Sequence, residues 1–416
     1  MMTRSHSSMQ EKLGASLKAL LMAGLLLSSA LTSADDGEGF PAWVAALKQE
    51  ALALHIEPQA VDVTLNQVTY LPRVIELDRK QPEFVTSFSA YVNRRINQRV
   101  VNKGKQMLQD YQGVLYVVEE LYQVPKEVLV AFWGLETNFG GFMGDIPLAS
   151  ALATLSYEGR RADFFKRELL NLMRVVEREH RYDSPVTGSW AGATGHMQFM
   201  PSTLLKYGVD ADADGKIDIW GSYPDIFSSA ANYLSQAGWQ AGKPISMLVA
   251  LPPGFDYSQA QLQLYKPVSE WVKLGVVGVP DGALSLPQAA IILPQGFDGP
   301  AYMVFPNFDV IMQWNRSVNY ALSVSLLSQQ LRQDMYTLAM PPEPLALSYQ
   351  QMWTLQEALN AKGFDSGTPD GFPGGKTQAA IRRYQATQKL PQDGYPGIDI
   401  FNRLTAETIY NAPIGQ

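Results

Sequence analysis

The chain has 416 residues, of which 46% are hydrophobic and 11% aromatic, so it is large enough to bury extensive cores in two or more domains. Its 33 Lys and Arg residues against 40 Asp and Glu residues give a net charge of −7, which argues against general nucleic-acid binding. There is no cysteine, which excludes disulfides and the lipid-attachment site of a bacterial lipoprotein. Core packing must therefore supply the stability, with a bound metal as the other available source.

The N-terminal segment has the pattern of a secretory signal peptide. Basic residues precede the apolar run from Ala19 to Leu31, and small residues follow it. The run is shorter than a typical transmembrane helix, and an uncleaved membrane anchor is the alternative interpretation. We expect residues 1–34 to be a signal peptide cleaved after Ala34, and the mature chain to be a periplasmic protein without a lipid anchor.

From Phe40 to about Gln240 the hydrophobic spacing is mostly helical. We expect helices over residues 40–54, 102–122, 147–157 and 162–177. Short apolar strands then alternate with Pro and Gly turns, which predicts a β-containing insert at about residues 241–307.

One glutamate stands at the end of an apolar run, VPKEVLVAFWGLETNFGG. Pro125 suits the first helical turn, and Gly140 suits the stop. On this helix Glu136 shares a face with Phe132 and Trp133, which directs it toward an interior or a cleft wall. Desolvation there favours the neutral carboxylic acid, the form that donates a proton. The alternative is a glutamate that pairs with an arginine or caps a neighbouring backbone.

A glycine-rich turn follows in GSWAGATGHMQFMPST. Glycines such as Gly192 and Gly195 let the backbone approach a neighbour closely. Ser189 and Gln198 flank the turn and are candidates for hydrogen bonds to a polar ligand. A tight packing turn is an equally good interpretation.

Alternating aspartates come next, with the spacing of an EF-hand-like loop. Carboxylates at loop positions 1, 3 and 5 converge on one point, where a hard cation offsets their repulsion. Position 12 is Gly221 instead of glutamate, so we expect Asp225 to close a lengthened loop over residues 210–225. We predict a structural Ca²⁺ or Na⁺ site, with a solvated acidic turn as the alternative. The predicted ligands are Asp210, Asp212, Asp214, the Lys216 carbonyl and Asp225.

The stretch QWNRSVNYALSV brings together Trp314, Asn315 and Tyr320. Aromatic rings that stack on sugars and amides that bind hydroxyl or acetamido groups are typical of carbohydrate sites, and also of ordinary cores. Beyond it, residues 337–347 read as a Pro-rich linker. Residues 348–412 repeat the turn DGFPG as DGYPG, which predicts a small helical domain.

Together these motifs resemble one family, the bacterial lytic transglycosylases of the B type, which cleave peptidoglycan. The resemblance rests on GLETNFG, ALATLSYEGRRADFF, SWAGATGHMQFMPST, DADADGKIDIW, SAANYL and WNRSVNYALSV, in family order from roughly Phe40 to Asp334. The C-terminal segment resembles an appended peptidoglycan-binding domain. The resemblance implies a mainly α fold, with a lysozyme-like helical catalytic domain at residues 35–336, a small β-containing subdomain and a small helical peptidoglycan-binding domain.

The resemblance also implies roles for individual residues. Glu136 matches the catalytic acid, and Trp314 stands where a tyrosine is familiar. The resemblance implies that the protein needs no organic cofactor and that its partner is the glycan strands of peptidoglycan. It leaves open whether other cell-wall enzymes are partners. The positions that match substrate-binding residues are Tyr91, Ser189, Gln198, Tyr233, Asn315 and Tyr320.

The implied reaction needs one carboxyl group, where ordinary glycosidases need two. Glu136 would protonate the oxygen between N-acetylmuramic acid and N-acetylglucosamine, and then take the proton of the muramyl C6 hydroxyl as it closes a 1,6-anhydro ring. A muramidase is the first alternative, with Asp145, Glu158 or Asp163 as its second carboxylate. A non-catalytic wall-binding scaffold is the second alternative.

Overall fold

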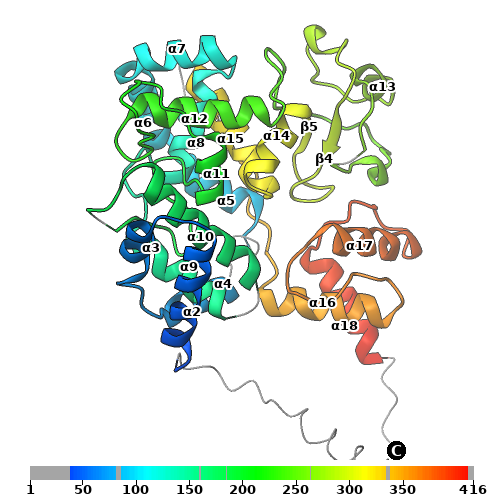
Figure 1. Cartoon of the computed structure of the whole chain (residues 1–416). Coiled ribbons are helices and arrows are strands. Elements are labelled where there is room, and N and C mark those ends of the chain that lie inside the picture. The colour runs from blue at the N-terminus through cyan, green and yellow to red at the C-terminus, as the bar shows by residue number, and fades with distance from the viewer. Residues whose placement is uncertain are drawn as a thin grey trace, which may run out of the picture.

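The computed structural model of the chain describes residues 38–80, 86–158, 161–183, 185–262, 264–333 and 338–410. The signal peptide expected at residues 1–34 lies outside these residues. Helices dominate and the strands are short, so the predicted mainly α class is confirmed (Figure 1). Within the described residues, no helix is long and apolar enough to cross a bilayer.

The helices up to residue 240 enclose two apolar cores. One core contains α8 and α12, and the other lies among α2, α3, α9 and α10, which lie at the lower left of Figure 1. The glycine-rich turn and the acidic loop connect helices of both groups. The bounds are α2 (Phe40–Ala53), α3 (Pro58–Leu65), α4 (Pro72–Lys80), α5 (Phe88–Arg95), α6 (Gln98–Asp110), α7 (Gln112–Tyr122), α8 (Lys126–Thr137), α9 (Leu148–Tyr157), α10 (Ala162–Arg178), α11 (Pro201–Tyr207) and α12 (Tyr223–Gln236).

The single helix expected over residues 102–122 is wrong, because the chain breaks at Tyr111 between α6 and α7. The Tyr111 ring lies 5.4 Å from the Trp133 ring and 4.1 Å from the Tyr223 ring. Burial of the ring in this aromatic cluster outweighs helical continuity, and Gly113 weakens the helix at the same place.

The predicted β-containing insert forms a three-stranded antiparallel sheet in the order β3 (Ser246–Val249), β5 (Ala301–Val304), β4 (Ala290–Ile292). Met303 in the middle strand pairs with Met247 and Ile291. A third apolar core backs this sheet and includes the buried Trp271. The remaining elements of this region are the short helices η2 (Tyr257–Gln259), α13 (Val268–Lys273) and η3 (Asp281–Ala283).

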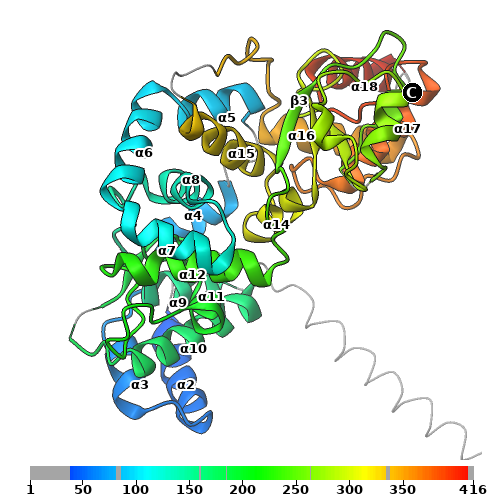
Figure 2. The same cartoon turned by 90° about the horizontal axis from the view of Figure 1, so that it is seen from above.

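The chain returns from the insert to the helical part through α14 (Pro306–Trp314) and α15 (Val318–Arg332). Helix α15 packs along α8 and α5, and Figure 2 shows α15 beside α5 and α8. A separate two-stranded pair, β1 (Ile146–Pro147) with β2 (Thr187–Gly188), joins the loop after α8 to the glycine-rich turn.

The C-terminal helices α16 (Tyr349–Ala361), α17 (Gly375–Thr387) and α18 (Ile398–Tyr410) enclose a small core of their own. The two repeated turns are built alike. Gln356 Nε2 donates to Asp370 Oδ1 at 2.8 Å, and Gln385 Nε2 donates to Asp393 Oδ1 at 2.6 Å. The second turn also contacts the insert, because Phe297 N donates to Asp393 Oδ2 at 2.8 Å.

Candidate active site and acidic loop

Glu136 lies in the last turn of α8, a helix of 12 residues of which eight are buried. Pro125 is the N-cap, so the helix begins one residue after the position that the sequence assigned to its first turn. The helix ends earlier than expected, because Asn138 already adopts a left-handed conformation (φ 51°) ahead of Gly140. Asparagine tolerates this conformation better than most residues, so it can replace glycine as the stop. Glu136 itself is half-buried at this end.

Two donors from the segment after the insert reach the same oxygen of Glu136. Trp314 Nε1 donates to Glu136 Oε1 at 2.9 Å, and the Tyr320 hydroxyl makes a short hydrogen bond to that oxygen. Trp314 ends α14, and Tyr320 lies in the first turn of α15. Glu136 Oε1 thus accepts from two fixed donors, which stabilise the ionised form of the carboxyl group.

Tyr320 is buried against this carboxyl group instead of facing a cleft. Burial, and then the charge of Glu136, raise the pKa of Tyr320 well above its ordinary value. The phenol therefore stays protonated and serves as a fixed donor. Tyr91 contributes to the same environment, and the Arg95 guanidinium lies 4.8 Å from the Tyr91 ring centre.

An aromatic wall centred on Trp314 lies beside Glu136. The Trp314 ring lies 4.6 Å from Phe132, 5.2 Å from Phe199 and 4.8 Å from Tyr233. Tyr233 projects from α12 and is half-buried, so its ring is accessible in part. Rings with one exposed face are suited to sugar stacking.

The glycine-rich turn closes on itself and on the loop after α8. Ser189 N donates to the Ala193 carbonyl at 2.7 Å, and Ala193 N donates to Ser189 Oγ at 3.1 Å. Gln198 Nε2 donates to the Met143 carbonyl at 3.0 Å and to the Gly195 carbonyl at 2.9 Å. The amide N–H groups of Gln198 thus hold the turn together, and its Oε1 is the atom suited to a ligand.

The sequence-predicted substrate residues lie in three places. Tyr320 supports Glu136 from the interior, and buried Tyr91 lies near Tyr320, while Tyr233 belongs to the aromatic wall. Asn315 caps the C-terminal end of α14 and is half-buried, next in the chain to Trp314. Ser189 and Gln198 lie on the turn just described.

The acidic loop, residues 210–225, gathers three carboxylates. One oxygen from each of Asp210, Asp212 and Asp214 lies within 4.8 Å of the others. Gly215 has φ +87°, the turn that position 6 of such a loop requires. Three anions this close repel one another, so the donor set fits a hard cation that neutralises them.

Asp225, the expected closing ligand, lies outside this group of three. It is buried, and its two oxygens accept from Ala211 N and Asp218 N, each at 2.8 Å. Burial raises its pKa, and these backbone N–H groups act in the opposite direction. Asp225 therefore ties the two halves of the loop together, and its coordination of a cation stays a prediction.

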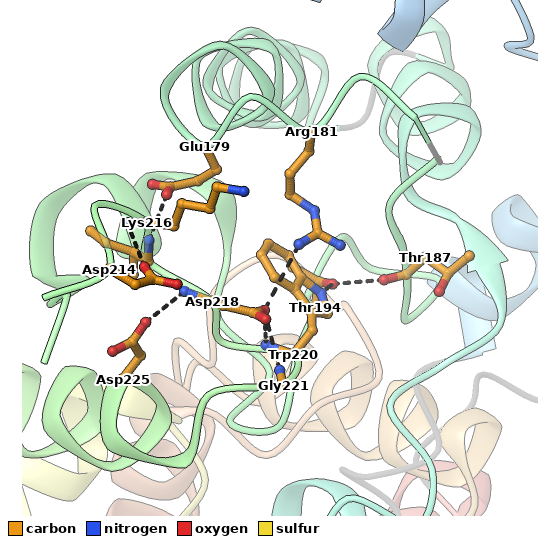
Figure 3. Close-up of polar contacts among 11 residues, drawn as sticks. Glu179, Arg181, Thr187, Thr194, Asp214, Lys216, Asp218, Trp220, Gly221 and Asp225 are labelled. Carbon is orange, nitrogen blue, oxygen red and sulfur yellow. Dashed lines mark hydrogen bonds and ion pairs between the residues drawn. The ribbon is translucent and has the colours of Figure 1, made fainter. Parts of the chain in front are cut away.

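The far side of the acidic loop is anchored to α10 and to the glycine-rich turn (Figure 3). Buried Glu179 accepts from Ile217 N at 2.6 Å. Arg181 lies over the Trp220 ring, 4.1 Å from its centre, and Trp220 Nε1 donates to Thr194 Oγ1 at 2.9 Å. The loop is thus rigidly attached to the turn that carries Ser189 and Gln198.

Sequence reasoning missed the buried pair of Trp133 and His196. Trp133 Nε1 donates to His196 Nδ1 at 2.8 Å, and Thr137 Oγ1 donates to the His196 carbonyl at 2.9 Å. A histidine inside an apolar, glycine-rich stretch was the available signal, because a buried imidazole needs polar partners.

Comparisons with known proteins identify two families along the chain. The transglycosylase SLT domain family matches residues 39–329, and the peptidoglycan binding domain family matches residues 348–404. The membrane-bound lytic murein transglycosylase B of Escherichia coli is 33% identical over 238 residues, which are 55% of this chain and 63% of that protein. The chain thus spans less than two thirds of the length of that relative.

Two solved structures share the fold. SltB3 from Pseudomonas aeruginosa, in complex with NAG-NAM-pentapeptide, is 41% identical with a TM-score of 0.83, and the match covers 88% of this chain and 100% of that one. The Escherichia coli lytic transglycosylase Slt35, in complex with calcium, is 30% identical with a TM-score of 0.61, covering 69% and 92%. The chain therefore belongs to the transglycosylase SLT family, the lytic transglycosylases whose motifs its sequence resembles.

Proposed function

We propose that this protein is a peptidoglycan lytic transglycosylase with Glu136 as its single acid and base. It cleaves the β-1,4 bond between N-acetylmuramic acid and N-acetylglucosamine and leaves 1,6-anhydromuramic acid ends. The complex of its relative SltB3 with NAG-NAM-pentapeptide supports this substrate class. The observation that carries the proposal is the pair of donors, Trp314 and Tyr320, on one oxygen of Glu136.

The two donors define how the carboxyl group works. The N–H of Trp314 and the O–H of Tyr320 fix the position of the carboxyl group, and the neutral acid donates its proton to the bridging oxygen. As the glycosidic bond breaks, the substrate's 2-acetamido carbonyl stabilises the cation at C1. The ionised Glu136 then accepts the C6 hydroxyl proton while that oxygen bonds to C1, so no water is consumed. The same donors stabilise the carboxylate between the two steps.

The contacts of the rival carboxylates support this proposal over a muramidase. Glu158 accepts a hydrogen bond from the Tyr70 hydroxyl at 2.6 Å, and the Tyr70 ring packs in the second core. Asp163 lies exposed in the first turn of α10, and Asp145 is exposed in the loop before β1. A muramidase would need one of them at a fixed separation from Glu136.

We also propose the supporting roles that the motifs imply. Tyr233, Asn315, Ser189 and Gln198 contact the glycan, and the acidic loop holds a structural Ca²⁺ or Na⁺. The calcium in the structure of the relative Slt35 supports the second assignment. The domain at residues 348–412 keeps the enzyme on the wall, and the signal peptide directs it to the periplasm.

The experiment is a digest of purified peptidoglycan with the released ends read by mass spectrometry. We expect anhydromuramyl ends from the wild type, and no release by Glu136→Gln although that variant still sediments with the wall. Asp145→Asn is the matched control and should keep wild-type activity. Reducing ends from the wild type, or normal release by Glu136→Gln, would overturn the proposal.

A further inference from the structure

A buried histidine joins the catalytic helix to the acidic loop. His196 and Trp133 are almost fully buried, and their rings share the hydrogen bond from Nε1 to Nδ1. Because an indole N–H can only donate, His196 Nδ1 is the unprotonated acceptor and the ring proton resides on Nε2. The backbone of Trp220 lies close enough to the same ring to oppose the lowering of its pKa. The ring therefore has a hydrogen-bond partner in α8 and a polar neighbour in the acidic loop.

The backbone of His196 makes the same two connections. Its N–H donates to the Ile219 carbonyl at 3.0 Å, and its carbonyl accepts from Thr137 Oγ1 at 2.9 Å. Thr137 follows Glu136 in the chain, and Trp133 precedes it by just under one helical turn. The contacts of His196 thus hold α8 on both sides of the proposed catalytic acid.

The His196 ring and the backbone beside it are closely packed. A Cβ on Gly140 would lie 2.4 Å from His196 Cε1, so the loop after α8 rests directly on the ring. A Cβ on Gly195 would lie 2.7 Å from Ile219 Cδ1, so the backbone immediately before the histidine lies against the acidic loop. The indole of Trp220, which donates to Thr194, adds a parallel attachment beside it (Figure 3).

We propose that His196 is a positioning residue that fixes the Glu136 end of α8 to the acidic loop. The inference rests on the proposed function, because it concerns the placement of the acid in that reaction. A displacement of a catalytic group by 1 Å can lower a rate by about 100-fold. The hydrogen bonds from Trp133 and Thr137 to His196 are the contacts that prevent such a displacement.

Two substitutions separate hydrogen bonding from packing. His196→Gln keeps an acceptor for Trp133 and a polar N–H group toward the Trp220 backbone, whereas His196→Phe fills the space without either group. On soluble NAG–NAM oligosaccharides we expect His196→Phe to lower kcat by about 10- to 100-fold with KM within about two-fold. His196→Gln should stay within about five-fold of the wild type. Wild-type kcat in folded His196→Phe, or equal losses in both variants, would overturn the proposal.

Trp133→Phe tests the same hydrogen bond from the other partner. If the bond acts as a unit, Trp133→Phe and His196→Phe should lower kcat by similar factors, and the double variant should be no worse than the poorer single one. If the loss of kcat in the double variant equals the product of the losses in the two single variants, the proposal is contradicted.

A spectroscopic measurement tests the hydrogen bond between Trp133 and His196 directly. It does not require His196→Phe to fold, and it does not depend on which reaction the wild type catalyses. With ¹⁵N-labelled tryptophan, the Trp133 indole N–H should be protected from solvent exchange in the wild type and in His196→Gln. Fast exchange of this N–H in the wild type would overturn the proposal, even if the peptidoglycan digest supports the transglycosylase. A wild type that releases no anhydro ends would instead overturn the proposed function and leave this result standing.

Discussion

Trp314 Nε1 lies 2.9 Å from Glu136 Oε1, although 178 positions separate the two residues in the chain. The contact exists because α14 and α15 return from the β-containing insert and α15 packs on α8. In the family that the motifs resemble, a tyrosine is familiar at the position of Trp314. Here an indole N–H reaches the acid, and the same indole also forms part of the aromatic wall.

Replacing Trp314 by phenylalanine should slow the reaction. Phenylalanine keeps a ring against Phe132 and Tyr233 but removes the N–H donor to Glu136. Loss of a hydrogen bond to a charged group costs about 1.5 to 3 kcal/mol, which corresponds to about a 10- to 150-fold loss of kcat if the bond is strongest in the transition state. Steady-state kinetics on soluble glycan oligosaccharides measures this. Trp43→Phe, in the second core, is the control and should keep wild-type kcat.

Tyr320→Phe should reveal the coupling of the two donors. Because both groups donate to Oε1, removal of one hydrogen bond changes how much the other contributes to kcat. The effects of the two substitutions on kcat should therefore not multiply. A double-mutant cycle with Trp314→Phe measures the interaction. Agreement with simple additivity to within about 0.5 kcal/mol would show that the donors act separately.

Local patterns in the sequence predict the elements that depend on nearby residues. Glu136 on an apolar helix, the aspartates of the acidic loop with Gly215, and the strands of the insert were all readable from spacing. The break at Tyr111 was not, because it follows from the burial of that ring against Trp133 and Tyr223, which are distant in the chain.

The contacts within the candidate site were the least predictable part. Trp314 and Tyr320 are suited by composition to a sugar site, yet their N–H and O–H groups point at Glu136. Trp133 finds its acceptor in His196, 63 positions away. Hydrogen bonds between residues so far apart in the chain depend on how the helices pack. The spacing of residues within a single helix does not predict them.

Asp212→Asn should weaken cation binding to the acidic loop. The substitution removes one of three clustered carboxylates and keeps an acceptor oxygen for the Ser222 hydroxyl. A ligand at about 100 times its Kd stabilises a protein by about 2.7 kcal/mol, so Ca²⁺ should raise the wild-type Tm and raise that of the variant much less. Calorimetric titration and thermal unfolding measure both effects. Asp281→Asn, an exposed acid elsewhere, should respond as the wild type does, and equal responses of all three proteins would refute the site.

His196 should make the folded state sensitive to mild acid. Burial lowers its pKa below the ordinary 6.5, while Asp218 and the Trp220 backbone act against that change. Below pH 6.5 the histidine therefore binds a proton more readily in the unfolded chain than in the folded chain. The free energy of unfolding consequently falls as the pH falls. Urea unfolding at several pH values should show a smaller fall in His196→Gln. Parallel pH profiles for the two proteins would contradict this.

Gln356→Leu should destabilise the C-terminal domain. Gln356 is buried, and it donates to Asp370 and accepts from Gly371 N, so leucine would leave buried polar groups without partners. Such losses cost about 1 to 3 kcal/mol per group. We expect a lower unfolding temperature and weaker sedimentation with purified wall. Gln388→Leu, at an exposed position of the same domain, is the control and should change neither quantity.

The most direct test of the account is a peptidoglycan digest in H₂¹⁸O with the purified mature protein. A transglycosylase closes the muramyl ring with its own C6 oxygen, so we predict ends that are one water lighter than reducing ends and carry no ¹⁸O. Reducing ends with one ¹⁸O atom each would show that water attacks C1. That result would make the protein a muramidase and would contradict the assignment of Glu136 as its single acid and base.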